Sequence, residues 1–359
     1  MLPEDIPALQ AAVLDWFGRN ARPMPFRDTR DPYAIWVSEI MLQQTTVAAA
    51  TPYWERFMAR FPTVRQLADA LLDDVLHAWA GLGYYSRARN LHAAARQVVE
   101  RHGGVFPRSF EDVLALPGIG RYTAGAICSF AFNDNVPVVD ANISRVLARL
   151  MLIYGDPRSG FTHRELWRIA EVILPHGRAR DWNLALFDIG ASVCVPEAPR
   201  CPECPISPWC SARREGRQSE FPQIAPKPPM EAQADVGLVI RDAEGRILLL
   251  QRPPTGVWAG MWEVPRGTVQ PGESLENAAR RIAAERLGVE VTLGEYITAI
   301  RHTVMRRSIA LHAYEAKLQE RIATGRWVTT EEAKALALPS PQRKLMAMVH
   351  TETTTEVTE

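Results

Sequence analysis

The sequence predicts a mainly helical first domain and a smaller α+β second domain, and three observations carry this prediction. Apolar residues recur at helical spacing through most of residues 6–192. Residues 116–124 read LPGIGRYTA, which is a Pro-Gly turn between two helices. After a Pro-rich stretch at residues 221–235, the pattern changes to short strands separated by turn residues. A chain of 359 residues has room for about two domains of roughly 150 residues each.

The composition limits the possible functions. The formal net charge is zero, so the chain as a whole carries no electrostatic signature of nucleic-acid binding. No lysine occurs before Lys227, which leaves the first domain without a side-chain amine that could form a Schiff base. The first residues lack the features of a signal peptide, and no apolar run reaches membrane-spanning length. We therefore expect a soluble intracellular protein whose cysteines are reduced or metal-bound.

The first domain is predicted as a series of helices. Residues 6–20 form the first, and a Pro-rich loop at 22–27 leads to a helix whose body spans 35–45. On this helix Glu39 is either a carboxylate in an apolar setting or a surface residue on the polar stripe. Further helices are expected at 51–61, 64–70, 73–81, 88–101, 110–116, 121–132, 143–154, 163–174 and 181–192, with a Gly-hinged loop at 81–89.

The turn at residues 116–124 organises this domain. Gly118 and Gly120 can adopt positive φ, and the helix that follows exposes free backbone N–H groups at its start. An anion such as a DNA phosphate is a natural ligand for such groups. A lone Gly-x-Gly turn is also typical of an ordinary helical hairpin. Here, however, residues 138–142 (VVDAN) bring Asp140 to the start of the next helix.

Together, the L-P-G-I-G-x-x-T-A and V-V-D-x-N motifs resemble the helix–hairpin–helix DNA glycosylase superfamily. The resemblance implies that Asp140 lies at the mouth of a pocket into which a base is flipped. Both motifs and their spacing agree with that superfamily.

A Pro-rich loop at residues 194–210 contains four cysteines with the spacing C-x6-C-x2-C-x5-C. Four thiols so close together indicate a metal site, which is either structural zinc or a [4Fe–4S] cluster. The spacing resembles the cluster loop of the endonuclease III and MutY proteins, which implies the iron–sulfur cluster. The expected ligands are Cys194, Cys201, Cys204 and Cys210, while Cys128 is expected in the core.

The predicted domain limits are 1–220 for the helical domain, 221–235 for a linker, 236–350 for the second domain and 351–359 for a disordered tail. The second domain resembles the Nudix fold, because residues 267–289 match much of the Nudix box. Ile282 and Arg286 replace two acidic positions of that box, so we expect its magnesium site to be lost.

Residues 36–45 and 81–91 closely resemble the MutY-type adenine DNA glycosylases, and the order of motifs extends the resemblance to about residue 350. It implies a monofunctional enzyme that removes adenine mispaired with 8-oxoguanine or guanine, in base excision repair. Bifunctional relatives carry a lysine at the position of Tyr122. We expect a monomer that binds double-stranded DNA and no membrane, in the cytoplasm and on the nucleoid if the source is bacterial. The second domain is expected to contact the base opposite adenine.

The chemistry explains the two carboxylates. Adenine leaves as a neutral base once it is protonated, and Glu39 can protonate N7 if an apolar pocket raises its pKa. Asp140 then balances the cationic sugar or forms a transient covalent adduct, as in retaining glycosidases. By resemblance, Tyr122 and Asn142 hold Asp140 and position water.

The same resemblance implies the remaining site residues. DNA contacts are expected from Leu42, Gln43, Gln44, Thr45, Tyr84, Arg87, Gly118, Gly120, His302, Thr303 and Arg306, and base-pocket contacts from Phe26 and Arg27. The chain departs from the family at Phe26, where tryptophan is common, and at Leu184, where glutamine or glutamate is usual. Val304, Met305 and Arg306 replace a Phe-Ser-His-like trio.

Three alternatives remain open. The enzyme could be a glycosylase for another mispaired base, such as thymine or uracil. It could be a nucleoside-triphosphate pyrophosphatase fused to a DNA-binding module, although Ile282 and Arg286 argue against it. It could also be an inert DNA-binding protein, which the presence of Glu39 and Asp140 makes improbable.

Overall fold

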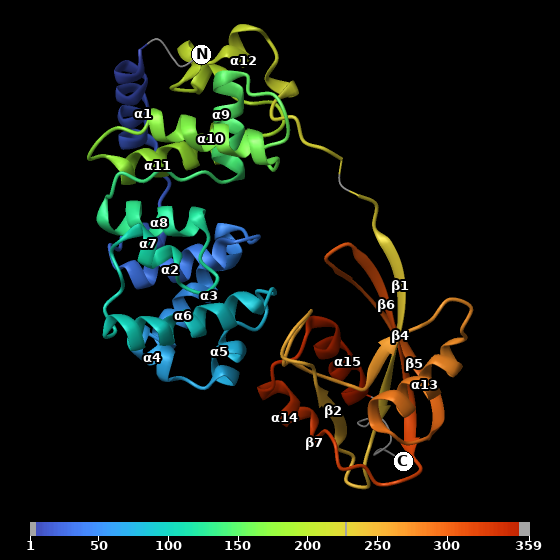
Figure 1. Ribbon diagram of the computed structural model, residues 1–359. Helices are drawn as coiled ribbons and strands as arrows, with labels where there is room; N and C mark the ends of the chain where they lie inside the picture. Colours follow the sequence, from blue (N-terminus) through green and yellow to red (C-terminus); the bar gives the residue numbers. More distant parts are fainter. Residues whose placement is uncertain (1–4, 227, 352–359) are drawn as a thin grey trace. The chain divides into compact units, whose positions relative to one another are not determined.

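The computed structural model describes residues 5–226 and 228–351 and divides into two compact units (Figure 1). Unit 1 comprises the described residues up to 70 together with residues 90–226. Unit 2 comprises residues 71–89 and the described residues after 227. The segment 71–89 was expected in the first domain and is instead grouped with unit 2. The predicted tail at 352–359 lies outside the described residues.

Unit 1 is helical, and its helices begin where the sequence supplies capping side chains. Asp31, Thr46 and Asp140 each accept a backbone N–H in the first turn of the helix that follows them. The helices are α1 Ile6–Asn20, α2 Pro32–Leu42, α3 Val47–Arg60, α4 Val64–Asp69, α6 Ser86–His102, α7 Phe110–Leu114, α8 Arg121–Phe132, α9 Ala141–Met151, α10 Gly160–Val172, α11 Ala179–Asp188 with a π-turn Ile189–Val193, and α12 Ser211–Arg214. The first four residues of α6 are grouped with unit 2, and its remainder from residue 90 belongs to unit 1.

Helix α2 is the most deeply buried helix that bears a candidate site residue. Its side chains from Tyr33 to Met41 are all buried, and it packs against α3 and α8. A helix that is apolar on every face can be stable only when other helices surround it. Its C-terminal end is earlier than expected: α2 ends at Leu42, and Gln44 adopts a left-handed conformation at φ 58°.

Unit 2 contains two sheets, whose strands are β1 Glu231–Ile240, β2 Ile247–Gln251, β3 Trp262–Glu263, β4 Arg266–Thr268, β5 Val291–Val304, β6 Arg307–Leu318 and β7 Arg326–Val328. The four-stranded sheet has the order β4-β1-β6-β5, in which β1 runs parallel to β6 and the other pairs are antiparallel. The three-stranded sheet has the order β3-β2-β7 and is antiparallel. The helices that lie wholly in unit 2 are α5 Leu72–Ala78, α13 Leu275–Leu287, α14 Thr330–Ala335 and α15 Ser340–Thr351.

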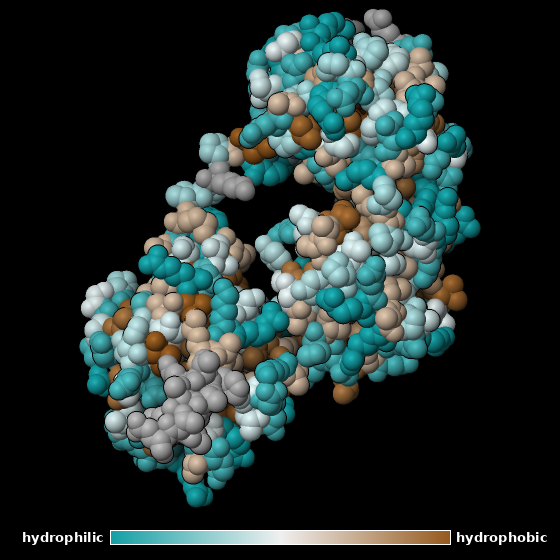
Figure 2. Space-filling view, turned by 180° about the vertical axis from the view of Figure 1, so that it is seen from behind, coloured by the Kyte–Doolittle hydropathy of each residue, from teal (hydrophilic) through white to brown (hydrophobic). Residues whose placement is uncertain are grey.

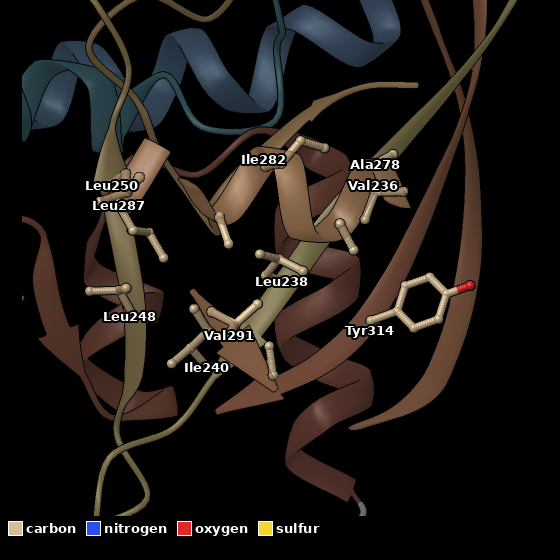
Figure 3. Packing of buried hydrophobic residues seen from close by; sticks show 13 residues of the cluster. Val236, Leu238, Ile240, Leu248, Leu250, Ala278, Ile282, Leu287, Val291 and Tyr314 are labelled. Carbon is tan, nitrogen blue, oxygen red and sulfur yellow. The ribbon is translucent and has the colours of Figure 1, made fainter. Parts of the chain in front are cut away.

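The alternation of side chains along β1 builds two cores in unit 2. Val236, Leu238 and Ile240 belong to a cluster with residues of α13, and Figure 3 shows these side chains together with Ile282. Val239 belongs instead to a second cluster that includes residues of β2, α14 and α15. Ile282 is fully buried in the first cluster. The residue that replaces an acidic Nudix-box position therefore serves the core.

The first strand of unit 2 begins earlier than the sequence predicts. Strand β1 begins at Glu231, inside the predicted linker, because residues 231–235 pair with residues 307–311 of β6. Strands β5 and β6 leave a turn of only Met305 and Arg306 between them. His302, Thr303 and Val304 therefore lie on a strand rather than on a loop.

On the face shown in Figure 2, hydrophilic residues cover most of the surface and hydrophobic residues are scattered among them. Such scattering is ordinary for a protein surface. Within the part of the chain that the structure describes, no helix has the length and apolar character needed to cross a bilayer.

Candidate active site

A cavity of about 400 Å³ in unit 1 brings together both residues predicted for the base pocket and all the predicted catalytic residues except Tyr122. Its walls come from the loop before α2, from α2 itself, from the start of α9 and from α11. Among the predicted site residues, those that line it are Phe26, Arg27, Glu39, Leu42, Thr45, Asp140 and Asn142. Leu184, a position where the sequence departs from the family, also lines the cavity.

Glu39 is a buried acid on α2, with 8% of its surface exposed. The hydroxyl of Tyr122 on α8 donates a hydrogen bond of 2.9 Å to its Oε2 atom. Burial raises the pKa of Glu39 to about 7, the negative charge of Asp140 also raises it, and the Tyr122 bond and Arg27 oppose this shift. This geometry agrees with the interpretation of Glu39 as a carboxylate in an apolar setting, and not with a surface residue on a polar stripe.

Asp140 is held at the N-terminus of α9. Val138 and Val139 are buried and anchor the chain before it, and Asp140 has extended backbone angles. Its Oδ1 accepts from the backbone N–H of Ile143 at 2.7 Å, and its Oδ2 accepts from Nδ2 of Asn142 at 3.0 Å. Burial raises the pKa of Asp140, while these hydrogen bonds oppose the increase. The carboxylate therefore has a fixed orientation at the cavity wall.

Asn142 is itself fixed by Arg145, a residue that sequence reasoning missed. Nη2 of Arg145 donates to Oδ1 of Asn142 at 2.9 Å and to the carbonyl of Gly190 at 2.8 Å. Its Nε donates to the carbonyl of Cys194 at 2.7 Å. The one signal in the sequence was an arginine on a helix whose neighbouring residues are mostly apolar.

A second missed residue is Asp188, whose side chain is fully buried at the end of α11. It accepts from Nε of Arg22 at 2.6 Å, and from Nη1 and Nη2 of Arg27 at 2.7 and 2.8 Å. This bidentate geometry fixes the guanidinium of Arg27 in the cavity wall. The partners are more than 160 positions apart in the chain.

The two glycines of the hairpin turn have different backbone conformations. Gly118 has a φ of +76°, and a Cβ added there would lie 2.5 Å from Cβ of Asn90, so no other residue fits. Gly120 has a φ of −98° and precedes α8 as its N-cap residue. Only Gly118 therefore adopts the positive φ that the sequence suggested for both glycines. Gly120 leaves the first backbone N–H groups of α8 exposed to a ligand.

The remaining predicted DNA contacts of unit 1 lie at the end of α2. Gln43 is the residue at the C-terminal cap, and its Nε2 lies 3.5 Å from Oγ1 of Thr123. Gln44 has a left-handed backbone conformation.

The other predicted DNA contacts belong to unit 2. Tyr84 is 55% exposed, and the guanidinium of Arg87 lies 5.6 Å from the centre of its ring. His302 is partly buried and its ring lies 5.6 Å from that of Trp258. Thr303 is exposed on β5, and Arg306 forms an ion pair of 2.8 Å with Glu231.

The four loop cysteines line one small cavity beneath α9. Nη1 of Arg149 lies 3.4 Å from Sγ of Cys194, and Nε2 of Gln218 lies 3.7 Å from Sγ of Cys201. Among the described residues, no three His, Cys, Asp or Glu side chains are grouped closely enough to bind a single metal ion. The cysteines that share the cavity are Cys194, Cys201, Cys204 and Cys210.

Comparison with known proteins agrees with this geometry. Residues 37–171 match the HhH-GPD superfamily of base excision DNA repair proteins, and residues 236–348 match the NUDIX domain. The human adenine DNA glycosylase is 33% identical over 95% of this chain and 74% of its own length. The Mycobacterium tuberculosis adenine DNA glycosylase is 36% identical over 77% of this chain and 86% of its own length.

Solved structures extend the likeness of unit 1. A thermostable thymine-DNA glycosylase has a TM-score of 0.54 and 32% identity, over 58% of this chain and 97% of that one. A non-covalent endonuclease III–DNA complex has a TM-score of 0.51 over 60% of this chain and 99% of that one, and at 21% identity it shows the fold alone. The chain therefore belongs to the adenine DNA glycosylase family of base excision DNA repair enzymes.

Proposed function

We propose that this enzyme removes adenine mispaired with 8-oxoguanine or guanine in double-stranded DNA, and that it acts as a monomer. The observation that carries the proposal is the pair of carboxyl groups in one cavity: burial raises the pKa of Glu39 to about 7, and hydrogen-bond donors hold Asp140. The names of its relatives support adenine as the base that leaves. We also propose that it acts in the cytoplasm, on nucleoid DNA if the source is bacterial.

In this mechanism Glu39 is the general acid. With a pKa of about 7, a large fraction of the side chain keeps its proton at neutral pH, and the Oε1 atom is available to donate it to N7 of adenine. The hydroxyl of Tyr122 donates to the other oxygen and so orients the carboxyl group. Protonation of N7 lets adenine depart with the electron pair of the glycosidic bond.

Asp140 is proposed to stabilise the sugar after that bond breaks. Departure of the base leaves an oxocarbenium-like cation, and a negative carboxylate beside it lowers the barrier or forms a transient covalent adduct. Asn142 holds one oxygen of Asp140 in place at 3.0 Å and, with Tyr122, is proposed to position the water that completes hydrolysis. The products are free adenine and an abasic site.

We propose that the enzyme is monofunctional. A lyase would need an amine near the sugar, whereas Tyr122 occupies the position where bifunctional relatives carry lysine, and unit 1 has no lysine before Lys227. Burial next to Glu39 raises the pKa of Tyr122 well above 10, so its hydroxyl is a hydrogen-bond donor and not a nucleophile. Borohydride should therefore trap almost no covalent protein–DNA complex, and efficient trapping would contradict this proposal.

DNA binding is proposed to involve both units. The exposed backbone N–H groups after Gly120 suit a phosphate, and Arg87 carries a cation beside the exposed ring of Tyr84. Phe26 and Arg27 are proposed to contact the flipped adenine. The other residues proposed to contact DNA are Leu42, Gln43, Gln44, Thr45, Gly118, His302, Thr303 and Arg306.

We propose that the four loop cysteines hold a [4Fe–4S] cluster. Four cysteines that line one cavity supply the donor set of such a cluster, and Arg149 and Gln218 place N–H donors beside two of the sulfurs. The cluster would stabilise the loop after unit 1's last long helix. Protein purified without oxygen should contain about four iron atoms per chain. Zinc without iron in that material would overturn the assignment.

One observation favours a second candidate function. The thymine-DNA glycosylase resembles unit 1 at 32% identity, and Leu184 replaces a polar residue that is usual in adenine-specific enzymes. Mispaired thymine is therefore the competing substrate. Single-turnover cleavage of a panel of duplexes that carry 8-oxoguanine:adenine, guanine:adenine, guanine:thymine or guanine:uracil pairs, followed by alkali, tests both candidates. Strand cleavage at adenine alone supports the proposal, and faster cleavage at thymine or uracil would replace it.

A further inference from the structure

The residues that follow α12 reach the cavity that the four loop cysteines line. Helix α12 comes directly after Cys210 and packs against α9 (Figure 1). A single 3₁₀ turn, Gln218–Glu220, comes next, and Gln218 lines the same cavity as the cysteines. We call residues 217–221 the cap segment, because they bring a polar side chain to the wall of a cavity that contains four sulfur atoms.

Arg149 holds the C-terminal end of the cap segment. Phe221 is only 1% exposed, and its carbonyl accepts a hydrogen bond of 2.9 Å from Nε of Arg149. Arg149 is itself buried on α9, and its Nη1 lies 3.4 Å from Sγ of Cys194. One guanidinium group thus contacts both the cap segment and a cysteine of the loop. The cap segment is therefore fixed against the helix that forms one wall of the cavity.

Arg217 holds the N-terminal end of the cap segment. Its backbone N–H donates to the carbonyl of Ala212 at 2.8 Å. Its guanidinium forms ion pairs of 3.2 Å with Glu215 and 2.8 Å with Glu220, and it donates to the hydroxyl of Tyr154 at 3.0 Å. Exposed ion pairs are weak one by one, but three partners together restrict this side chain. Gln218 therefore follows an anchored residue and has a defined direction.

The side chain of Gln218 directs its amide toward a cysteine. Its Nε2 donates to Sγ of Cys201 at 3.7 Å, and both residues are partly buried. An N–H group beside a thiolate stabilises the negative charge on the sulfur, and the amide adds no charge of its own. Hydrogen bonds to the sulfurs and exposure to solvent are two of the factors that set the reduction potential of an iron–sulfur cluster. Gln218 is placed to affect both.

From these observations we propose that Gln218 is a positioning residue that protects the cluster from oxidation, an inference that rests on the proposed [4Fe–4S] cluster. Its N–H group stabilises the charge on the sulfur of Cys201 and so favours the more reduced, more negative state of the cluster. Its side chain also occupies space beside that sulfur which water would otherwise fill. Arg149 and Arg217 contribute by holding the two ends of the cap segment.

Redox titration and iron release of the full-length protein, purified without oxygen, test the proposal. Gln218→Met keeps the length of the side chain and removes the N–H donor, and Gln218→Glu keeps its shape and places an acceptor beside the sulfur. We expect both variants to have a lower midpoint potential for oxidation of the cluster than the native protein. Ferricyanide takes one electron from the cluster and becomes ferrocyanide. Under this oxidant the variants should release iron roughly tenfold faster or more, as is typical of substitutions next to metal ligands.

Gln223→Met and Gln223→Glu are the matched controls, because Gln223 is exposed, lies just beyond the cap segment and does not line the cavity. Both should have the potential and the iron-release rate of the native protein. Gln218→Met changes no charge, so it keeps the test valid if Gln218→Glu does not fold. Native protein without iron would refute the cluster, and this inference with it. Native protein that contains iron, with a potential and a release rate that the Gln218 variants leave unchanged, would overturn the role of Gln218 alone.

Discussion

Both units contain buried carboxyl groups, and the two sets of carboxyl groups have opposite surroundings. In unit 1 the partner of Glu39 is the neutral hydroxyl of Tyr122, and the Glu39 pKa rises to about 7. In unit 2 the buried Glu263 lies 2.7 Å from a guanidinium nitrogen of Arg252, and the buried Asp235 is paired with Arg266. Burial alone therefore does not make a carboxyl group reactive, since the charge of its partner decides the outcome.

The contrast explains why the carboxyl group of unit 1 suits proton transfer and those of unit 2 do not. An acid that lacks a cationic partner keeps its proton and can transfer it. A carboxylate surrounded by guanidinium groups is instead held as an anion and fixes those groups in place. Four experiments test this difference, and they are described from the largest expected effect to the smallest.

The largest effect is expected from Glu39→Gln in unit 1. The substitution keeps the shape of the side chain but removes the transferable proton, so adenine release should slow by about 100- to 10,000-fold or more. Duplex binding should remain nearly intact. In the native enzyme the single-turnover rate should fall as the pH rises through about 7, because Glu39 then loses its proton.

Glu171→Gln is the control for this experiment, since Glu171 is exposed on α10 and does not line the cavity. Its single-turnover rate should equal that of the native enzyme. Rapid adenine release by Glu39→Gln would show that Glu39 is not the general acid. The proposed difference between the carboxyl groups of the two units would then be wrong.

A loss of stability is expected from Glu263→Gln in unit 2. The side chain of Glu263 is fully buried, and the neutral amide would leave Arg252 without its counter-charge. Removing one partner of a buried ion pair typically costs about 3–5 kcal/mol. Hydrogen exchange of β2 and β3 should therefore become faster, while exchange in unit 1 stays unchanged. Unchanged protection of both strands would mean that this carboxylate is dispensable.

Glu39→Gln is expected to increase the stability at pH 8, whereas Glu263→Gln is expected to decrease it. The native fold raises the pKa of Glu39 from 4.5 to about 7, so folding favours the protonated form. The native protein is therefore penalised as pH rises from 4.5 to 7, and the penalty stays constant above 7. At pH 8 the variant should be more stable by about 3 kcal/mol, at 1.36 kcal/mol per pKa unit. Below pH 4 the two proteins should have equal stability.

Hydrogen exchange of α2 measures this difference at pH 8 after correction for intrinsic exchange rates, and Glu171→Gln again serves as the control. A variant that is less stable than the native protein at pH 8 would show that the ionised Glu39 side chain stabilises the fold and does not destabilise it.

The sequence predicted those parts of the site that depend on local patterns. Gly118 follows from the turn that its neighbours define, and Asp140 follows from its place before a helix. Glu39 was recognisable because α2 is apolar on both sides of it. Each of these residues obtains its position from chain segments within a few residues of it.

The partners that fix these residues come from distant segments, and no local pattern reveals them. Asp188 bonds Arg22 across 166 positions, and Arg145 reaches the carbonyl of Cys194 across 49. The extent of β1 depends on pairing with β6, about 75 residues later in the chain. Such contacts depend on the packing of whole elements, so sequence periodicity did not predict them.

The smallest effect concerns the turn between β5 and β6. Met305 is 81% exposed there with a φ of 53°. Val304 and Met305 stand where the family has an aromatic wedge and a hydroxyl, and Arg306 and Arg307 follow them. Guanidinium groups bind phosphates and O6 but do not distinguish 8-oxoguanine from guanine. We therefore expect weaker discrimination between 8-oxoguanine:adenine and guanine:adenine duplexes than is usual in the family, and binding that is more sensitive to salt.

Affinities of both duplexes over a salt series, for the native protein and for the double variant Arg306→Ala/Arg307→Ala, measure this effect. Each phosphate contact that is lost should reduce the slope of log affinity against log salt by about 1, so the double variant should lose up to about 2. Arg280→Ala is the control, because that exposed arginine lies on α13 and away from the turn. A strong preference for 8-oxoguanine, together with a shallow salt slope that the double variant leaves unchanged, would mean that unit 1 alone distinguishes the two duplexes.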